Sequence, residues 1–408
     1  MLPRRWGRLG CTVLMLATGP ALASEGLLDI LAKAKLADPS LRGAAFVQSA
    51  DMEAVQQARA RLLPSASFSI EEADTDEEIL KSENIVTNGS SAGYRTSAYT
   101  LTLNQSIYNH EYWVRYRQSK VVSDRASTDY DRATQDFLIN VAERYFTVLK
   151  TKEQLGAISA EKEALKSHVD YATKSRRVGL SRQAEVVDAE ARYYTALAEE
   201  ARFTKDLDDA RYSLMEMTGE FHSDLRPIQE QLPMRAPEPA LAQEWIDRGL
   251  SQSPDVLSQK YTLQEAQMEV KAQNAGHFPT LDLVYTNTNE DQGGSLFGGA
   301  TEVETQKIAL QLSIPLYQGG GVSSRKRQAI DRMYKSQEDL IRIQRQVTKE
   351  VNTAFQGVVA NVAQVEALQK TLASQQEVLR NKERGLQAGL YPMLAVLDAQ
   401  RDLAIAQR

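Results

Sequence analysis

The chain has 408 residues, of which 42% are hydrophobic, and its formal net charge is -6 at neutral pH. This acidic balance argues against nucleic acid as a partner. The single cysteine, Cys11, lies in a segment that we expect to be removed, so the mature protein would have neither a disulfide nor a thiol nucleophile.

The first 23 residues have the pattern of an export signal peptide. Three arginines precede an apolar run from Leu9 to Ala17, and Ala21-Leu22-Ala23 supplies a small-x-small cleavage site. The apolar run is too short for a membrane-spanning anchor, and no later stretch reaches the roughly 18 apolar residues of a transmembrane helix. Removing this segment takes away three positive charges and no acid, so the mature chain carries -9.

Residues 24–236 form the first of two predicted repeats. The expected elements, in chain order, are a helix, a β-hairpin over 65–108, a long helical hairpin over 110–219 and a linker over 220–236. Within the β-hairpin, Tyr99, Leu101 and Leu103 alternate with polar residues, and we expect strands of about nine to eleven residues around a polar tip. The stretch from His110 to Arg177 has no proline and one apolar stripe, which predicts a single helix about 100 Å long.

Residues 237–408 repeat this pattern. The expected elements are a helix, a β-hairpin over 280–317 and a helical hairpin over 322–408. Pro64 corresponds to Pro279 and Asp188 to Asp398, and only the hairpin segment changes length, so a whole structural unit is duplicated. The matching helix of the first repeat predicts that the last helix continues about twenty residues past the final residue, so we expect a truncated sequence.

Four strands with one apolar and one polar face cannot lie in lipid alone, because each open sheet edge would leave backbone groups unpaired. They must close with strands from other copies, and twelve or more strands can enclose an aqueous lumen. The sequence therefore predicts an α+β membrane protein that is an oligomer. Pro315 and the run Gly319, Gly320 and Gly321 are expected at a strand-to-helix joint, where glycine lets the backbone change its twist.

Several duplicated segments give the chain a resemblance to a known family. They are Asp38-Pro39-Ser40-Leu41, Leu312-Ser313-Ile314-Pro315-Leu316-Tyr317, Val178-Gly179-Leu180 and Val396-Leu397-Asp398-Ala399. In this order they resemble the TolC-like outer-membrane channel proteins over nearly the whole mature chain. The resemblance implies a homotrimer in the outer membrane, with four transmembrane strands per protomer in a twelve-stranded barrel and a periplasmic α-helical barrel.

The resemblance also implies the partners. They are a periplasmic adaptor (membrane fusion) protein, an inner-membrane ABC or other transporter, and outer-membrane lipid. The channel would be a passive exit duct of a tripartite exporter, for type I protein secretion or, alternatively, for multidrug efflux. The mature chain has no N-terminal cysteine for a lipid anchor, and this favours secretion.

In that family acidic rings and polar links close the periplasmic mouth near the helix turns. The matching positions are Asp188 and Glu185 after the first turn, and Asp398 and Tyr391 at the second. Tyr391 replaces an expected arginine link, and Ala395 replaces an expected aspartate. Asp398 would be a lumen carboxylate that attracts cations, although an aspartate in the first turn of a helix is equally explained by the helix dipole.

Other classes of protein fit less well. The four histidines, His110, His168, His222 and His277, have no metal-ligand spacing, and no phosphate loop or nucleophile motif is present, so we expect neither an enzyme nor a cofactor. A periplasmic coiled-coil adaptor would have one helical hairpin rather than two. The acidic tip between 71 and 93 could bind calcium, but it lacks EF-hand spacing and reads better as a solvated loop.

Overall fold

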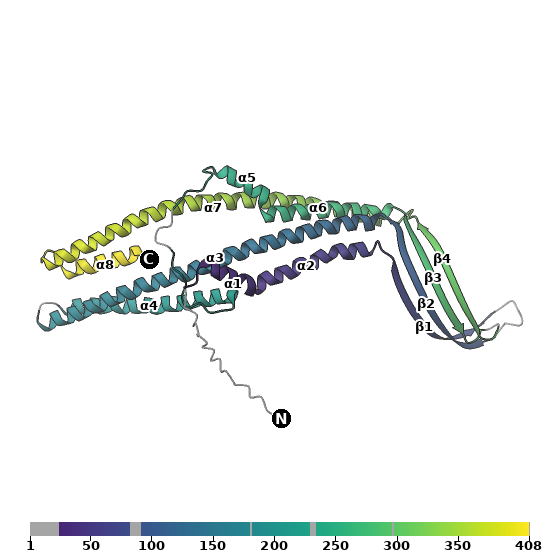
Figure 1. Ribbon diagram of the computed structural model, residues 1–408, viewed down its shortest axis with the longest axis horizontal. Coiled ribbons are helices and arrows are strands. Elements are labelled where there is room, and N and C mark those ends of the chain that lie inside the picture. Colours follow the sequence, from purple (N-terminus) through teal and green to yellow (C-terminus); the bar gives the residue numbers. More distant parts are fainter. Residues whose placement is uncertain (1–23, 82–90, 180–181, 229–233, 296–297, 408) are drawn as a thin grey trace, which may run out of the picture. The chain divides into compact units, whose positions relative to one another are not determined.

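The computed structural model describes residues 24–81, 91–179, 182–228, 234–295 and 298–407 (Figure 1). The predicted signal peptide, Cys11 and part of the predicted turn at 180–181 lie outside the described residues. The helices are α1 (Leu27–Ala37), α2 (Pro39–Ala60), α3 (His110–Arg177), α4 (Gln183–Thr218), α5 (Ala242–Gln252), α6 (Pro254–Asn274), the short 3-10 helix η1 (Ala275–His277), α7 (Gly321–Gln387) and α8 (Met393–Gln407). The strands are β1 (Ser65–Glu78), β2 (Ser91–Asn109), β3 (Thr280–Gln292) and β4 (Thr301–Ser313).

The chain divides into two compact units. One contains the described parts of 1–39, 138–234 and 366–408, and the other contains 40–137 and 235–365. The sheet belongs to the second unit, and the two helix turns belong to the first. Mostly helical structure with one antiparallel sheet confirms the predicted fold class.

The four strands form one antiparallel sheet in the order β1-β2-β3-β4 (Figure 1). Its register places Phe68 opposite Leu101, Leu103 opposite Tyr285, and Tyr285 opposite Ile308. Directly opposed residues share a face, so most of the large apolar side chains of the four strands lie on one side of the sheet, with Val284 and Val303 on the other. The other side carries mainly polar residues, such as the pair Thr100 and Thr288, whose hydroxyls lie 3.2 Å apart.

The strands are longer than the sequence predicted. They contain 14, 19, 13 and 13 residues, so the predicted length of nine to eleven was wrong. Much of each predicted polar tip is strand, because the backbone ladder continues after the apolar residues end and pairs Glu78 with Ser91. The second hairpin stops at Ser313 rather than 317. Pro315 follows, and it has no N–H to donate to a ladder.

Ion pairs join α3 to α6 within the second unit. Arg115 Nη1 lies 3.1 Å from Glu269 Oε2, and Arg125 Nε lies 2.9 Å from Glu265 Oε1. Burial raises the pKa of Glu265 despite the nearby guanidinium of Arg125. The two pairs link the first repeat to the second.

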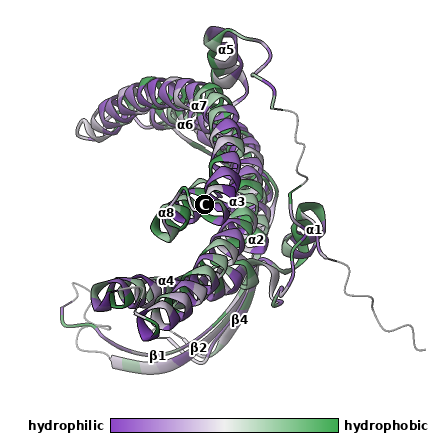
Figure 2. Cartoon of the chain, turned by 90° about the vertical axis from the view of Figure 1, so that its left-hand side faces the viewer, coloured by the Kyte–Doolittle hydropathy of each residue, from purple (hydrophilic) through white to green (hydrophobic). Residues whose placement is uncertain are grey.

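The helical hairpin of α3 and α4 provides the core of the first unit. Ile158 packs with Ala196 and Phe203, and nearer the turn Ala172 packs with Val186 and Ala189. The predicted apolar stripe of α3 is confirmed, since Val141, Tyr145 and Val148 are buried. α8 is mostly hydrophobic (Figure 2), and its buried residues are Val396, Leu397, Ala399 and Ala404.

A polar network holds the first described residues onto the end of α4. Arg226 N–H donates to the Glu25 carbonyl at 2.9 Å, and the Glu25 carboxylate accepts from Lys33 Nζ at 2.6 Å and from His222 Nδ1. His222 Nε2 lies 2.9 Å from Thr218 Oγ1. We call the four side chains of Glu25, Lys33, Thr218 and His222 the N-terminal clamp.

Candidate functional site

The turn from α7 to α8 is built on a glycine in the left-handed region. Gly389 has φ of 74°. Its N–H donates to the Leu386 carbonyl at 3.0 Å, and Leu390 N–H donates to the Gly385 carbonyl at 2.8 Å. These two bonds are those of a Schellman helix end, which satisfies the last carbonyls of α7 and reverses the chain.

The ring of Tyr391, which follows the turn, packs against the last part of α7 at Gly385. A Cβ at Gly385 would overlap the Tyr391 ring, so the absence of a side chain at 385 makes room for it. The ring packs against the hairpin that carries it and stays about half exposed. Pro392 follows, and α8 begins at Met393.

Arg192 connects the two predicted aspartates. Its Nε lies 3.2 Å from Asp188 Oδ2, one turn earlier on α4, and its Nη1 lies 3.4 Å from Asp398 Oδ1 on α8. Arg401 Nη1 approaches the same Asp398 oxygen at 3.7 Å, but its hydrogen bond at 2.9 Å goes to Asp402. The structure therefore brings Asp188 and Asp398 together around a positive charge.

A cavity of about 440 Å³ adjoins this group. Glu185 and Asp188 line it from α4, His168 lines it from α3, and Pro392 and Met393 line it from the start of α8. Burial lowers the pKa of His168, and the positive charge of Arg192 lowers it further. His168 is therefore neutral at physiological pH. Its buried Nδ1 has no hydrogen-bond partner among the described residues.

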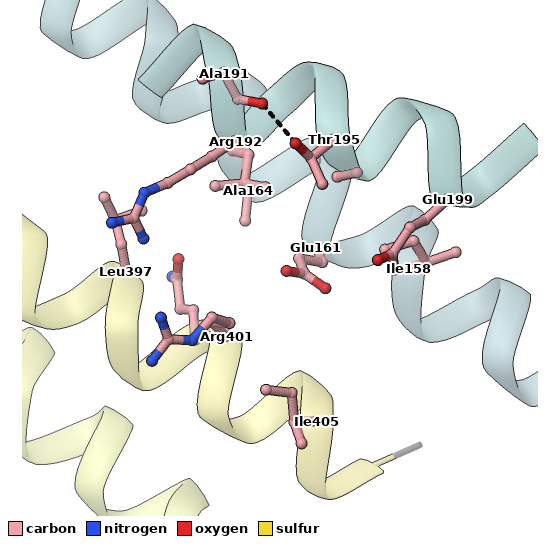
Figure 3. A pocket seen from close by; sticks show the side chains of 13 residues that line it. Ile158, Glu161, Ala164, Ala191, Arg192, Thr195, Glu199, Leu397, Arg401 and Ile405 are labelled. Atoms are coloured by element: carbon pink, nitrogen blue, oxygen red, sulfur yellow. Dashed lines mark hydrogen bonds between the residues drawn. The ribbon is translucent and has the colours of Figure 1, made fainter. Parts of the chain in front are cut away.

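A second cavity of about 470 Å³ lies between α3, α4 and α8. Figure 3 shows Arg192 reaching from α4 toward α8, with Arg401 of α8 on the other side of the cavity. Ile158, Leu397 and Ile405 give it an apolar wall. The beginning of α8 therefore lies against the α3–α4 hairpin, and Arg192 lines the cavity between them.

The structure places the predicted site residues in two groups. Asp188, Asp398 and Glu185 lie around Arg192 and the cavity next to it, whereas Tyr391 lies on Gly385. Their role as a channel constriction stays a prediction. Sequence reasoning missed Arg192 and Arg401. The spacing of Asp188 and Arg192 signals an i,i+4 pair, but nothing in the sequence links Arg192 to a carboxylate 206 residues away.

The predicted joint residues lie between β4 and α7. Gly319 and Gly320 have φ of 59° and 78°, which few other residues adopt, and Gly321 begins α7. Pro315 and Gly320 line a small cavity of about 120 Å³ there. At the equivalent place in the first repeat, β2 ends at Asn109 and α3 begins at the next residue.

Two features are absent from the described part of the chain. No group of three or more His, Cys, Asp or Glu side chains there could hold a metal ion. Among the helices of that part, none is sufficiently long and apolar to cross a membrane.

Comparison with known proteins identifies the family. The family model for outer membrane efflux proteins matches residues 30–220 and 245–408. The chain belongs to this family. It is therefore a protein of the outer membrane, and the resemblance stated from the sequence is confirmed.

Three curated relatives align over most of their length. The proteases secretion protein PrtF of Dickeya chrysanthemi is 27% identical over 400 residues, which is 97% of this chain and 86% of PrtF. Outer membrane protein TolC of Escherichia coli (strain K12) is 29% identical over 397 residues, covering 94% of this chain and 78% of TolC. The alkaline protease secretion protein AprF of Pseudomonas aeruginosa is 25% identical over 380 residues, covering 93% and 79%. These relatives are secretion and outer-membrane proteins rather than enzymes.

Solved structures share the fold of this chain. The CmeC outer membrane channel of Campylobacter jejuni has a TM-score of 0.79 at 17% identity, over 93% of this chain and 80% of CmeC. The outer membrane protein VceC of Vibrio cholerae has a TM-score of 0.76 at 15% identity, over 93% and 90%.

Proposed function

We propose that three copies of this efflux-family chain form the outer-membrane exit duct of a tripartite exporter for type I protein secretion. The observation that carries the proposal is the pairing of a sheet with one apolar face and helices of 68 and 67 residues in one chain. At about 1.5 Å per residue each helix is about 100 Å long, a length suited to crossing a periplasm. An adaptor protein and an inner-membrane ABC transporter would supply the substrate and the energy.

The edges of the sheet support an assembly of several copies. Within the described residues β1 pairs with β2 and β4 pairs with β3, and neither has a strand on its outer side. Open edges in lipid would leave backbone groups unpaired. Pairing β4 of one copy with β1 of the next closes both edges, and three copies supply twelve strands.

Disulfide cross-linking tests this assembly. The mature chain is predicted to contain no cysteine, so single pairs can be introduced on the polar face. Pairs between Ser67→Cys or Ser69→Cys on β1 and Gln311→Cys on β4 should give a ladder that ends at three chains. The matched control is Thr100→Cys with Thr288→Cys, directly opposed on neighbouring strands, which should link only within one chain. A ladder absent from every β1–β4 pair would refute the trimer.

The choice of protein secretion over drug efflux is supported by the names of two relatives, PrtF and AprF, which are protease secretion proteins. A deletion strain should lose a secreted protein from the medium while drug tolerance changes little, and the cloned gene should restore secretion. The alternative, a multidrug efflux channel, is favoured by the family's description and predicts the reverse pattern.

We also propose that the protein acts passively, without a catalytic step or a cofactor. The remaining alternative, a periplasmic adaptor, is separated by fractionation. A channel subunit should stay in outer-membrane vesicles until detergent is added, whereas an adaptor without its own anchor would leave with the periplasmic extract after osmotic shock.

A further inference from the structure

Arg192 is placed to serve two carboxylates from different repeats. Its guanidinium presents separate nitrogens to each, Nε to Asp188 at 3.2 Å and Nη1 to Asp398 at 3.4 Å. All three side chains are partly exposed, with 34% of Arg192, 60% of Asp188 and 38% of Asp398 accessible. The planar fork of arginine suits such shared binding better than a lysine ammonium does.

The internal repeat makes this arginine unusual. The alignment that matches Asp188 with Asp398 also matches Arg192 with Asp402 and Arg401 with Ala191. Both repeats therefore keep the aspartate, but they do not share an arginine position. In the second repeat Arg401 makes its hydrogen bonds with Asp402, at 2.9 and 3.2 Å. Arg192 is thus the cation at hydrogen-bonding distance from both matched aspartates.

We propose that Arg192 sets the charge of the channel mouth by neutralising Asp398, and that it thereby limits how tightly the mouth binds multivalent cations. The inference rests on the proposed trimeric channel. Asp188, Asp398 and Arg192 together carry one negative charge per chain, hence three per trimer. Without the arginine the same positions carry six, and a ring of like charges around a narrow lumen attracts cations strongly.

The titratable groups next to Arg192 do not cancel the change in charge that removing it would cause. His168 on α3 is neutral, Glu185 on α4 adds a fixed negative charge, and the charges of Arg401 and Asp402 on α8 cancel. The ion pairs are partly exposed, and exposed pairs contribute little to stability. Replacing Arg192 should therefore change the charge of the mouth without unfolding the hairpin.

The first test compares purified wild-type and variant trimers in planar bilayers. Arg192→Gln should make the channel more cation-selective and should lower the La³⁺ concentration for half-block at least tenfold. Arg192→Lys keeps the charge, and Arg202→Gln changes an exposed arginine elsewhere on α4, so both should stay within twofold of wild type. Arg192→Gln combined with Asp398→Asn restores the net charge and should restore wild-type block.

A second test leaves Arg192 in place. Replacing both Asp188 and Asp398 with asparagine leaves Arg192 to offset Glu185, so the mouth would carry no net charge, its cation selectivity should disappear and La³⁺ block should be lost. If Arg192 does not act on the mouth, Glu185 will keep that variant cation-selective, Arg192→Gln will match wild type, and the inference is overturned. A wild-type protein that gives no channels at all would instead refute the proposed function.

Discussion

The N-terminal clamp offers the most direct test of how the first unit is held together. Glu25 is the acceptor for two nitrogen donors of different exposure. Lys33 is 39% exposed and also pairs with Glu220, whereas the His222 side chain is 3% exposed. A carboxylate has no proton to donate at neutral pH, so His222 Nδ1 carries the hydrogen of their bond. Removing the Glu25 carboxylate therefore leaves the buried His222 N–H without an acceptor.

The expected cost follows from these exposures. Leaving a buried donor without an acceptor costs about 1–3 kcal/mol. The exposed contact of Lys33 contributes less than about 1 kcal/mol, and Glu220 remains to accept from it. Glu25→Ala should therefore cost about 2 kcal/mol, which is a roughly 30-fold increase in local opening, whereas Lys33→Ala should cost less than about 1 kcal/mol.

Amide hydrogen exchange at Arg226 measures this opening, because its N–H bonds to the Glu25 carbonyl. Glu25→Ala should speed exchange there about 30-fold, with Glu153→Ala, an exposed change on α3, as the control. Equal exchange in Glu25→Ala and the control would refute the reasoning. So would a larger effect from Lys33→Ala, because the exposed contact would then be the important one.

Three further outcomes follow from single residues. Leu214 is fully buried on α4, so Leu214→Ala should lower the free energy of unfolding by about 2–5 kcal/mol. Leu197 is 40% exposed, so Leu197→Ala should lower the temperature of thermal unfolding much less than Leu214→Ala does. Gly389→Val places a β-branched residue at φ 74° and should cost at least about 1–2 kcal/mol, with faster proteolysis at the α7–α8 turn. Lys33 and His222 hold the pKa of Glu25 below its usual range, so the clamp's contribution is complete above about pH 4.5 and is lost as the pH falls through the lowered pKa. The protection of the Arg226 amide, relative to its intrinsic exchange rate at each pH, should therefore fall as the pH drops below the ordinary glutamate pKa of 4.5 in the wild type but not in Glu25→Ala.

The long helices could be predicted from the sequence because proline and the apolar stripe act locally. The stretch from His110 to Arg177 was expected as one helix, and α3 has those bounds. The sequence underestimates the length of the strands, because alternating apolar residues mark only the part of each strand that carries apolar side chains. Beyond that band Glu72 and Asp74 still pair in register with Ser97 and Arg95, and no apolar period reveals it.

The charged groups were the hardest to predict, since their partners are distant in the sequence. His222 is one of four histidines scattered along the sequence, yet it is 5% exposed and bound to a residue 197 positions away. The resemblance predicts Asp398 as a lumen carboxylate, and the structure pairs it with Arg192. The resemblance to a family predicts a role for the aspartate, but it does not predict that an arginine of the other repeat pairs with it.

The two ends of α4 are held by polar contacts of unequal strength, and the difference bears on how the proposed channel mouth would open. Near its first turn, α4 meets α8 through the Arg192–Asp398 pair, whose partial exposure limits it to about 1 kcal/mol or less. Beyond its last turn, α4 meets the N-terminal segment through a buried imidazole whose loss of a partner costs about 1–3 kcal/mol. Of these two polar contacts, the one between α4 and α8 therefore costs less to break than the one between α4 and the N-terminal segment. Exchange in α8 should exceed exchange at Arg226 in the wild type, and equal protection at the two ends would contradict this order.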